Sequence, residues 1–312
     1  MRIGIDIMGG DNAPEKIIEG VILASNELTN EVELLLFGQQ DQIETILKRH
    51  KLVKNNFKII HCEEKITMDE NPIKAFKNKQ ESSISKGFRF LADNKIDGFA
   101  SAGNTGAMFI GGYYSVQSIR GIIRPCISSV LPRINGEKTI LLDVGANVDC
   151  KADVLCQFGH IGSLYAEHVY NIKNPKVSLL NIGEEKSKGN MLTQTAYNLM
   201  NETKDYNFIG NIESRDIFDS ETDVVVCDGF TGNIVLKQAE GIYDLVERRK
   251  IKDDYFNKFN YEIYGGCPIL GLNKTVMIGH GISNEIAIKN MILHTKKIID
   301  ADLTKKIKQN IN

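Results

Sequence analysis

Two glycine-rich segments of this sequence carry side chains that could bind an anion. They are Ser101-Ala-Gly-Asn-Thr-Gly-Ala107 and Asp228-Gly-Phe-Thr-Gly-Asn233, and each directly follows an apolar run. Glycine lets the backbone approach a ligand closely, and the N–H groups that begin a helix attract negative charge. Phosphate is therefore the expected ligand. The alternative is that these residues form only N-caps and tight turns, which Asn, Thr and Gly also favour.

Neither segment matches a standard nucleotide-binding loop. No Gly-Lys-Ser/Thr follows, as a Walker A loop requires, and neither segment is a G-x-G-x-x-G dinucleotide fingerprint. A third glycine turn, Met8-Gly-Gly-Asp-Asn12, follows the first apolar run. Because ligands of open α/β sheets bind where strands end, the three turns favour one shared anion site. Its candidate residues are Asp11, Asn12, Ser101, Gly103, Asn104, Thr105, Gly106, Asp228, Thr231, Gly232 and Asn233.

The alternation of short apolar runs with amphipathic segments predicts the elements that position these turns. We expect a largely parallel sheet covered by helices on both faces, without a hard domain boundary. The predicted strands are 2–7, 32–37, 57–61, 96–101, 126–133, 139–144, 177–182, 207–210, 224–227 and 275–278, with 126–133 and 139–144 as a hairpin. The predicted helices are 15–28, 39–52, 73–94, 154–170, 190–201, a segment from the second glycine turn to about 249, and 287–300.

The composition of the chain bears on its binding partners and its cellular compartment. The 312 residues have a formal net charge of −2, which gives no general reason to expect nucleic-acid binding. The six cysteines include no C-x-x-C pair, so a reducing compartment is favoured over a disulfide framework, and no metal constellation is evident. The uncharged segment 98–119 holds five glycines, which favours a buried turn and helix over a membrane span. No signal peptide is visible, and we expect a cytoplasmic protein.

Nine segments resemble, in order, the motifs of the phosphate acyltransferases of bacterial phospholipid synthesis. Together they extend over nearly the whole chain. They are Asp6–Pro14, Ile66–Pro72, Ser101–Gly106, Arg124–Pro125, Leu131–Pro132, Leu142–Cys150, Asn181–Glu185, Lys188–Asn190 and Asp228–Asn233.

The resemblance implies both a fold and a reaction. The fold would be a three-layer α/β/α arrangement related to phosphotransacetylases, in the isopropylmalate-dehydrogenase-like class, with 1–312 as a single domain. The reaction would convert acyl-acyl carrier protein and orthophosphate to acyl phosphate and free carrier protein, without a cofactor. A homodimer, and delivery of the product to a membrane glycerol-3-phosphate acyltransferase, are also implied. The alternatives are a phosphotransacetylase that uses coenzyme A and a catalytically weak binding or regulatory protein.

Attack of phosphate on a thioester requires an anion site, a proton acceptor and oxyanion stabilisation. Arg124 could pair with phosphate bidentately, or form a surface ion pair. Asp143 and Asn147 could orient phosphate or accept its proton, or cap a helix. Lys188 could neutralise phosphate charge. His280 could carry a proton, or hold a structural turn.

Several features make other assignments less favoured or depart from the family pattern. Cys150 and Cys227 lie near the motifs and could suggest an acyl-enzyme, but no basic residue adjoins them in sequence, so packing is favoured.

Asn284 stands where the family generally has an aspartate. The segment around 240–264 is shorter than the family's helical hairpin, which is implicated in dimerisation and membrane contact. We therefore expect membrane contact that is at most peripheral.

Overall fold

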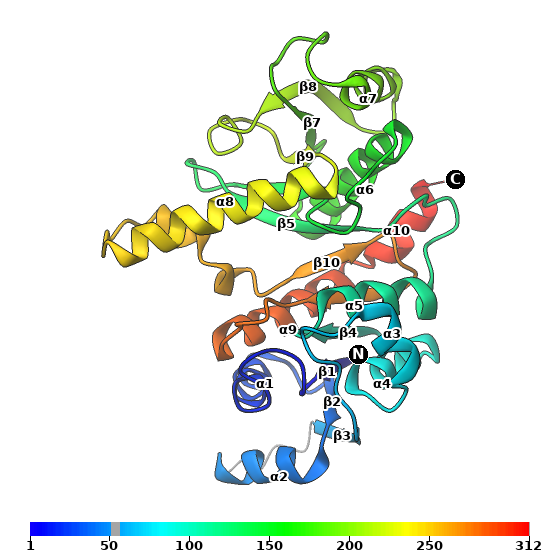
Figure 1. Cartoon of the computed structure of the whole chain (residues 1–312), viewed down its shortest axis with the longest axis vertical. Coiled ribbons are helices and arrows are strands. Elements are labelled where there is room, and N and C mark those ends of the chain that lie inside the picture. The colour runs from blue at the N-terminus through cyan, green and yellow to red at the C-terminus, as the bar shows by residue number, and fades with distance from the viewer. Residues whose placement is uncertain (51–56, 312) are drawn as a thin grey trace. The chain divides into compact units, whose positions relative to one another are not determined.

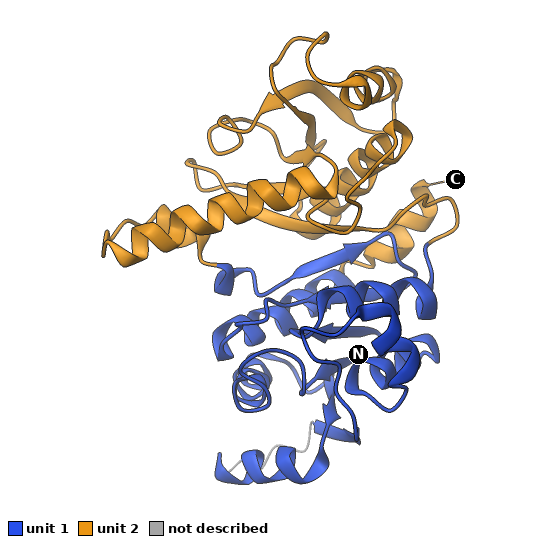
Figure 2. Ribbon diagram, in the orientation of Figure 1, with its two compact units in different colours: residues 1–118, 261–300 blue, residues 119–260, 301–312 orange. Residues whose placement is uncertain are grey.

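The computed structural model of the chain describes residues 1–50 and 57–311 (Figure 1). The chain forms two compact units, and both are assembled from separate parts of the sequence (Figure 2). Unit 1 comprises Met1–Ser118 and Tyr261–Asp300, and unit 2 comprises Ile119–Asn260 and Ala301–Asn312. The expected α/β architecture, with mostly parallel strands flanked by helices, is confirmed. That 1–312 behaves as a single domain stays a prediction.

Unit 1 contains strands in the order β3-β2-β1-β4-β11-β10. All neighbouring strands run parallel except β10 and β11, which are antiparallel. The strands are β1 (Arg2–Asp6), β2 (Glu33–Gly38), β3 (Phe57–His61), β4 (Gly98–Ser101), β10 (Cys267–Leu270) and β11 (Thr275–Ile278). The helices are α1 (Glu15–Glu27), α2 (Gln40–Arg49), α3 (Pro72–Asn78), α4 (Ser83–Ala92), α5 (Thr105–Gly111), the π-helix η1 (Gly112–Val116), the short 3₁₀ turn η3 (Tyr261–Ile263) and α9 (Glu285–Asp300).

Helices cover both faces of the unit 1 sheet, as two adjacent residues of β4 demonstrate. A Cβ on Gly98 would lie 2.9 Å from the Ile299 side chain of α9. The ring of Phe99 instead lies 2.2 Å from the position of a Cβ on Gly87 of α4. Since successive side chains of a strand point to opposite faces, α9 and α4 lie on opposite sides of β4.

Unit 2 contains strands in the order β5-β6-β9-β7-β8. The predicted hairpin is confirmed, because β5 and β6 pair antiparallel, whereas β6, β9, β7 and β8 pair parallel. The strands are β5 (Cys126–Pro132), β6 (Lys138–Leu142), β7 (Lys176–Asn181), β8 (Asn207–Glu213) and β9 (Val224–Val226). The helices are α6 (Ala152–Tyr170), α7 (Met191–Glu202), α8 (Gly229–Arg248), the 3₁₀ turn η2 (Phe256–Phe259) and α10 (Leu303–Asn310).

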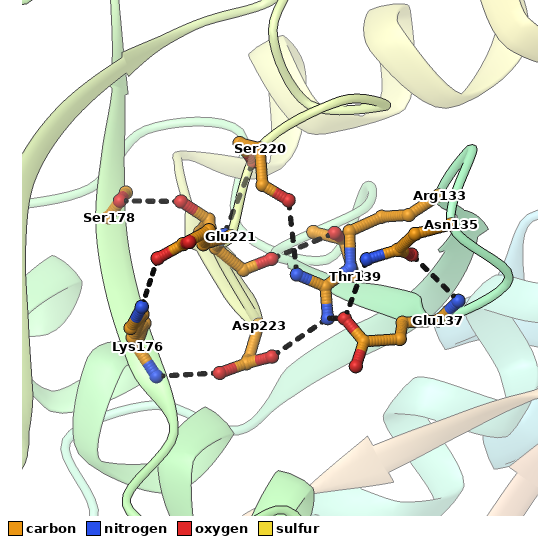
Figure 3. A network of polar contacts seen from close by, with 10 residues as sticks. Arg133, Asn135, Glu137, Thr139, Lys176, Ser178, Ser220, Glu221 and Asp223 are labelled. Atoms are coloured by element: carbon orange, nitrogen blue, oxygen red, sulfur yellow. Dashed lines mark hydrogen bonds and ion pairs between the residues drawn. The ribbon is translucent and has the colours of Figure 1, made fainter.

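A buried polar network joins the starts of the parallel strands of unit 2 (Figure 3). Arg133 is almost fully buried, and its guanidinium lies 2.9 Å from Asp223 and 2.8 Å from Glu137. Asp223 also accepts the Lys176 backbone N–H at 2.8 Å, and the Lys176 ammonium pairs with Glu221. These contacts fix the beginnings of β6, β7 and β9 relative to one another. The predicted Asp228–Asn233 turn lies at the opposite end of one of these strands, β9.

Some element boundaries differ from the sequence prediction. The single helix expected over 73–94 is two helices, because Ser82 caps α4 by accepting the Ser85 N–H at 3.2 Å. The short β10 and the final α10 were not predicted. Helix α2 ends at Arg49 with His50 as its C-cap, and positions 51 and 52 of the predicted helix lie outside the described residues. In the segment around 240–264, α8 ends at Arg248 and only the short turns η2 and η3 follow. Within the described ranges, no helix is long and apolar enough to cross a membrane.

Candidate functional site

A buried carboxylate at the end of β1 holds two of the predicted glycine turns. Asp6 accepts the N–H groups of Met8 and Gly9 at 2.9 and 3.2 Å, and the Ser101 hydroxyl at 2.6 Å. The same hydroxyl accepts the Gly103 N–H at 2.9 Å. Burial raises the pKa of Asp6, and the hydrogen bonds from Ser101 and Ser83 oppose that shift. Asp6 is not among the predicted site residues, although it lies two positions before the Met8–Asn12 turn.

The two turns of unit 1 touch through their backbones. A Cβ on Gly9 would lie 2.8 Å from both the Cα and the nitrogen of Gly103, and 2.3 Å from a carboxylate oxygen of Asp6. Any larger residue at position 9 would force the turns apart. Glycine is therefore required at position 9 by this close approach, whatever ligand the turns bind.

Asn104 and the helix that it begins have different roles at the first turn. The Asn104 side chain caps α5 by accepting the Ala107 N–H at 2.9 Å, and its amide donates to the carbonyls of Thr67, Met68 and Glu70. These contacts use both ends of the buried side chain. The exposed Thr105 and its neighbour Gly106 instead have N–H groups without a partner among the described residues. The geometry favours a positioning role for Asn104 and anion contact at these two amides.

A third loop of unit 1 joins the same turns. The Asp11 N–H donates to the Gly281 carbonyl at 2.8 Å, and the Asn12 side chain donates to the Ile282 and Ser283 carbonyls. The structure thus brings Asp11 and Asn12 together with the loop that carries His280. The His280 ring lies 5.1 Å from the Tyr261 ring, centroid to centroid, and its Nδ1 accepts the Ile282 N–H at the long distance of 3.5 Å.

The side chain of Asn284, the residue that departs from the family pattern, stabilises the backbone at the start of α9. Its oxygen accepts the N–H groups of Ile286 and Ala287 at the start of α9, and its amide donates to Glu262 at 2.7 Å. An aspartate could accept the same N–H groups but would place a second carboxylate against Glu262. Asparagine avoids that repulsion.

In unit 2, Asp143 and Asn147 form the interior of a tight turn after β6. One Asp143 oxygen accepts the Ile127 and Ala146 N–H groups, and the other accepts both the backbone and side-chain N–H of Asn147 at 2.6 and 2.9 Å. Asp143 is completely buried, and this burial raises its pKa. The Asn147 amide also donates to the Pro125 carbonyl at 2.8 Å. The geometry favours a positioning role for both residues, and their direct contact with phosphate stays a prediction.

The second glycine turn begins α8 and packs directly on the Asp143 turn. The Gly229 N–H donates to the Asn147 carbonyl at 2.7 Å. A Cβ on Gly232 would lie 1.9 Å from the Asp143 carbonyl oxygen, so no side chain fits there without movement. Asp228 caps the helix by accepting the N–H and hydroxyl of Thr231, both at 2.8 Å.

The first turn of α8 keeps one amide available. The N–H groups of Gly229, Thr231 and Gly232 are bonded to Asn147 and Asp228. Among the described residues, no partner accepts the Phe230 N–H. This amide lies at the positive end of a long helix, where an anion is stabilised.

The remaining predicted residues of unit 2 are exposed. Arg124 donates from Nη1 to the Asp149 carbonyl at 2.9 Å, which places it beside the loop that follows Asn147. Asn233 lies near Gly145, and Lys188 lies in the loop between β7 and α7 with no ion pair to the described residues. The structure thus brings Arg124, Asp143, Asn147 and the Asp228–Asn233 turn together. It shows no contact of the Lys188 ammonium with that group.

The cysteines and the cavity of unit 2 give no support to other chemistry at these turns. Burial raises the pKa of Cys150 to about 12 and that of Cys227 well above its usual range, so neither thiol is readily ionised. A cavity of about 440 Å³ is lined by residues of α6, α7 and α10 and by nearby loop residues, among them His160, Asp205 and Tyr206. None of the predicted site residues lines it.

Comparison with known proteins agrees with these motifs. Residues 1–253 match the family described as "Fatty acid synthesis protein". The whole chain aligns with proteins named phosphate acyltransferase: it is 43% identical to that of Halothermothrix orenii over 338 residues, which are 99% of that protein. It is 40% identical to that of Dictyoglomus turgidum and 38% identical to that of Staphylococcus aureus, with 98% of each relative covered. The chain belongs to the phosphate acyltransferase family.

As a member of this family, the chain is an enzyme of the transferase class. Its fold is also that of solved transacylases. A phosphotransacetylase from Streptococcus pyogenes superposes with a TM-score of 0.65 at 20% identity, covering 96% of this chain and 94% of the other. A branched-chain phosphotransacylase from Enterococcus faecalis gives a TM-score of 0.63 at 12% identity, covering 95% and 98%. The predicted phosphotransacetylase-like fold of this phosphate acyltransferase is confirmed.

Proposed function

We propose that this enzyme transfers the acyl group of an acyl-acyl carrier protein thioester to orthophosphate. Membership of the phosphate acyltransferase family supports the choice of phosphate as acceptor. The observation that carries the proposal is the packing of the α8 glycine turn on the Asp143 turn, beside the Phe230 N–H, which has no partner among the described residues. Such a preorganised amide, together with the exposed Arg124 guanidinium, suits an oxyanion or a phosphate.

The reaction needs neither a cofactor nor a covalent enzyme intermediate. A phosphate oxygen forms a bond to the thioester carbonyl carbon, and the carbonyl π electrons move to its oxygen. The tetrahedral intermediate then collapses, the carbon–sulfur bond breaks, and the carrier thiolate leaves. In unit 2, we assign the neutralisation of phosphate charge to Arg124 and Lys188, and anion contact to the Phe230 amide. The Thr105 and Gly106 amides are a separate candidate anion contact of unit 1.

Asp6 and Asp143 then act through the turns that they hold. Each is buried, and each accepts several N–H or O–H donors from a glycine turn. We place them as positioning residues, since neither carboxylate presents an exposed oxygen. His280 is retained as a candidate proton carrier of unit 1 because its ring is only half-buried.

Hydroxylamine trapping tests the proposed reaction. The purified chain is incubated with phosphate and either hexadecanoyl-acyl carrier protein or the corresponding acyl-coenzyme A, and acyl phosphate is measured as its hydroxamate. We expect product with the carrier-protein thioester that depends on phosphate. Product only with the coenzyme A thioester would favour the phosphotransacetylase-like alternative. No product from either thioester would leave the binding or regulatory alternative.

Family membership also supports the remaining expectations. We propose that the enzyme acts in bacterial phospholipid synthesis as a cytoplasmic homodimer that contacts the membrane at most peripherally. Its acyl phosphate would be used by a membrane glycerol-3-phosphate acyltransferase. Light scattering of the purified chain tests the dimer.

A further inference from the structure

The loops at the carboxyl ends of three neighbouring strands of unit 2 expose apolar side chains. Met191 and Ile182 are 85% and 79% exposed, more than any other large apolar residue described, and Phe230, Val148 and Ile234 are exposed by more than half. We call these five residues the apolar strip. An exposed apolar group of this kind at the carboxyl edge of a sheet commonly marks a binding surface.

A backbone contact joins the segments of Val148 and Phe230, and strand pairing places the loop that begins with Ile182 beside them. Val148 follows Asn147, whose carbonyl accepts the Gly229 N–H at 2.7 Å, and Phe230 follows Gly229. Strand β9 pairs parallel with β6 on one side and with β7 on the other, so the loops after these three strands leave one edge of the sheet side by side. The strands are spaced about 4.8 Å apart, so the three loops span about 10 Å.

The loop after β7 folds back on itself, so that Ile182 at its start lies close to the start of α7, where Met191 is the first residue. The Asn181 side chain donates to the Lys188 carbonyl at 3.2 Å, and its oxygen accepts the Ile182 N–H at 2.9 Å. A Cβ on Gly189 would lie 2.3 Å from the Asn181 oxygen, which shows how closely the two ends of the loop approach. Ile182 and Met191 flank this packed loop and are exposed, although burying them would be favourable.

The opposite ends of the same strands are charged. Arg133, Glu137, Lys176, Glu221 and Asp223 form the polar network that joins the starts of β6, β7 and β9 (Figure 3). Each of the three strands thus begins among charges and ends beside exposed apolar side chains. The carboxyl edge thus combines exposed apolar side chains with charged ones such as Lys188, which suits a ligand that has both an apolar chain and an anionic group.

We propose that the apolar strip binds the hydrocarbon chain of the acyl donor and thereby selects long acyl groups. This inference rests on the proposed function, because it is the acyl carbonyl at the α8 turn that brings the chain to this edge. Phe230 joins the two parts of the ligand site, since its N–H lies at the proposed anion contact and its ring belongs to the strip. Lys188, in the same loop as Ile182, supplies positive charge close to the strip.

Chain-length selectivity is the property that the strip determines. Each methylene removed from water strengthens binding by about fourfold, so a chain that covers the strip gains much more than a short one. We expect Ile182→Ser and Met191→Ser together to lower kcat/KM for hexadecanoyl-acyl carrier protein by about tenfold or more, mostly through KM. The same double variant should change kcat/KM for butanoyl-acyl carrier protein by less than about twofold.

Ile134→Ser is the matched control. Ile134 is 59% exposed, but it lies in the β5–β6 turn at the charged end of the sheet. Serine at this position should leave kcat/KM unchanged for both acyl donors. An equal loss for long and short donors in the Ile182/Met191 double variant, or no loss for either, would overturn the proposal. A change from dimer to monomer in that variant, seen by light scattering, would also overturn it, because the strip would then be an interface.

A binding measurement separates this inference from the proposed reaction. Dodecyl phosphate and butyl phosphate are titrated calorimetrically, below the micellar concentration, into the wild type, the double variant and Ile134→Ser. We expect the wild type and Ile134→Ser to prefer dodecyl phosphate by about tenfold or more, and the double variant to lose most of that preference. Equal affinity of the wild type for the two ligands would refute binding of the acyl chain by the apolar strip, even if acyl phosphate is formed. Preserved chain-length preference without acyl phosphate formation would count against the proposed reaction alone.

Discussion

The contact between Gly232 and the Asp143 turn predicts a large effect of a single methyl group. In Gly232→Ala the new Cβ would lie 1.9 Å from the Asp143 carbonyl oxygen and 2.8 Å from the Cys227 sulfur. A carbon and a carbonyl oxygen in contact are normally about 3.3 Å or more apart. The start of α8 and the Asp143 turn must therefore separate by about 1.4 Å, because both partners are backbone held by hydrogen bonds.

This separation should reduce both stability and activity. Overpacking of this kind costs about 1–3 kcal/mol in the free energy of unfolding. A displacement of about 1 Å at groups that bind the reacting atoms lowers kcat/KM by about a hundredfold. Hydroxamate trapping measures the second quantity, and urea unfolding followed by circular dichroism measures the first. Activity is measured under conditions in which the variant is fully folded, so that a fall in kcat/KM does not reflect unfolded protein.

Gly241 provides the control in the same helix. In the described part of the chain, no atom lies within 4 Å of a Cβ added there, so Gly241→Ala should keep activity and gain up to about 1 kcal/mol from helix propensity. If folded Gly232→Ala retains activity within about twofold of wild type, the close contact does not position the catalytic groups. An equal loss of activity in Gly241→Ala would show that α8 responds to any added methyl group.

Four further predictions test other parts of the structure. Arg124→Ala should raise KM for phosphate by about tenfold, from the loss of a charge-assisted contact, whereas Arg120→Ala, another exposed arginine of unit 2, should not; equal effects would refute a specific role for Arg124. Arg133→Met leaves Asp223 buried without its cation and should lower the unfolding free energy by about 3 kcal/mol, against less than about 0.5 kcal/mol for the exposed Arg215→Met; urea melts that rank the two variants together would contradict this. Burial lowers the pKa of His160 below 6.5, so its contribution to stability is present above pH 6.5 and is lost as the pH falls through the folded pKa; in His160→Gln this part of the acid destabilisation should vanish in urea melts, and an unchanged pH dependence would refute it. With only short turns after Arg248, flotation with anionic liposomes should recover little of the protein, and strong flotation would show that a long apolar hairpin is not needed for membrane binding.

Much of the fold could be predicted because its signals are local. The apolar runs of β3 and β11 were placed with correct boundaries, since period and flanking turns define them. The sequence predicts one helix over 73–94 and does not predict the break between α3 and α4, because only the structure shows that the Ser82 hydroxyl caps the second helix. Strand β10 is short and contains a proline, so only its pairing with β11 reveals it.

The candidate site could be predicted in its residue types but less well in the role of each residue. Glycine turns indicate where a backbone comes close to something, but not what it approaches. Gly9 and Gly232 approach other backbone, whereas the N–H groups of Gly106 and Phe230 have no partner among the residues described. Likewise Asp143 follows its strand as a catalytic base would, yet the N–H group of Ile127 in the neighbouring strand and those of Asn147 in its own turn occupy both its oxygens. Such distinctions depend on contacts between segments distant in sequence.

The division of the chain between the units bears on how the protein folds during synthesis. Strand β11 lies between β4 and β10, yet its residues are made more than 170 positions after β4. Until then, the first 118 residues present β4 as an open edge with unpaired N–H and C=O groups. All the strands of unit 2 lie between Ile119 and Asn260. On the ribosome, the strands of unit 2 are therefore complete before those of unit 1. The early β4 edge is the place where a chaperone or an aggregating neighbour would bind.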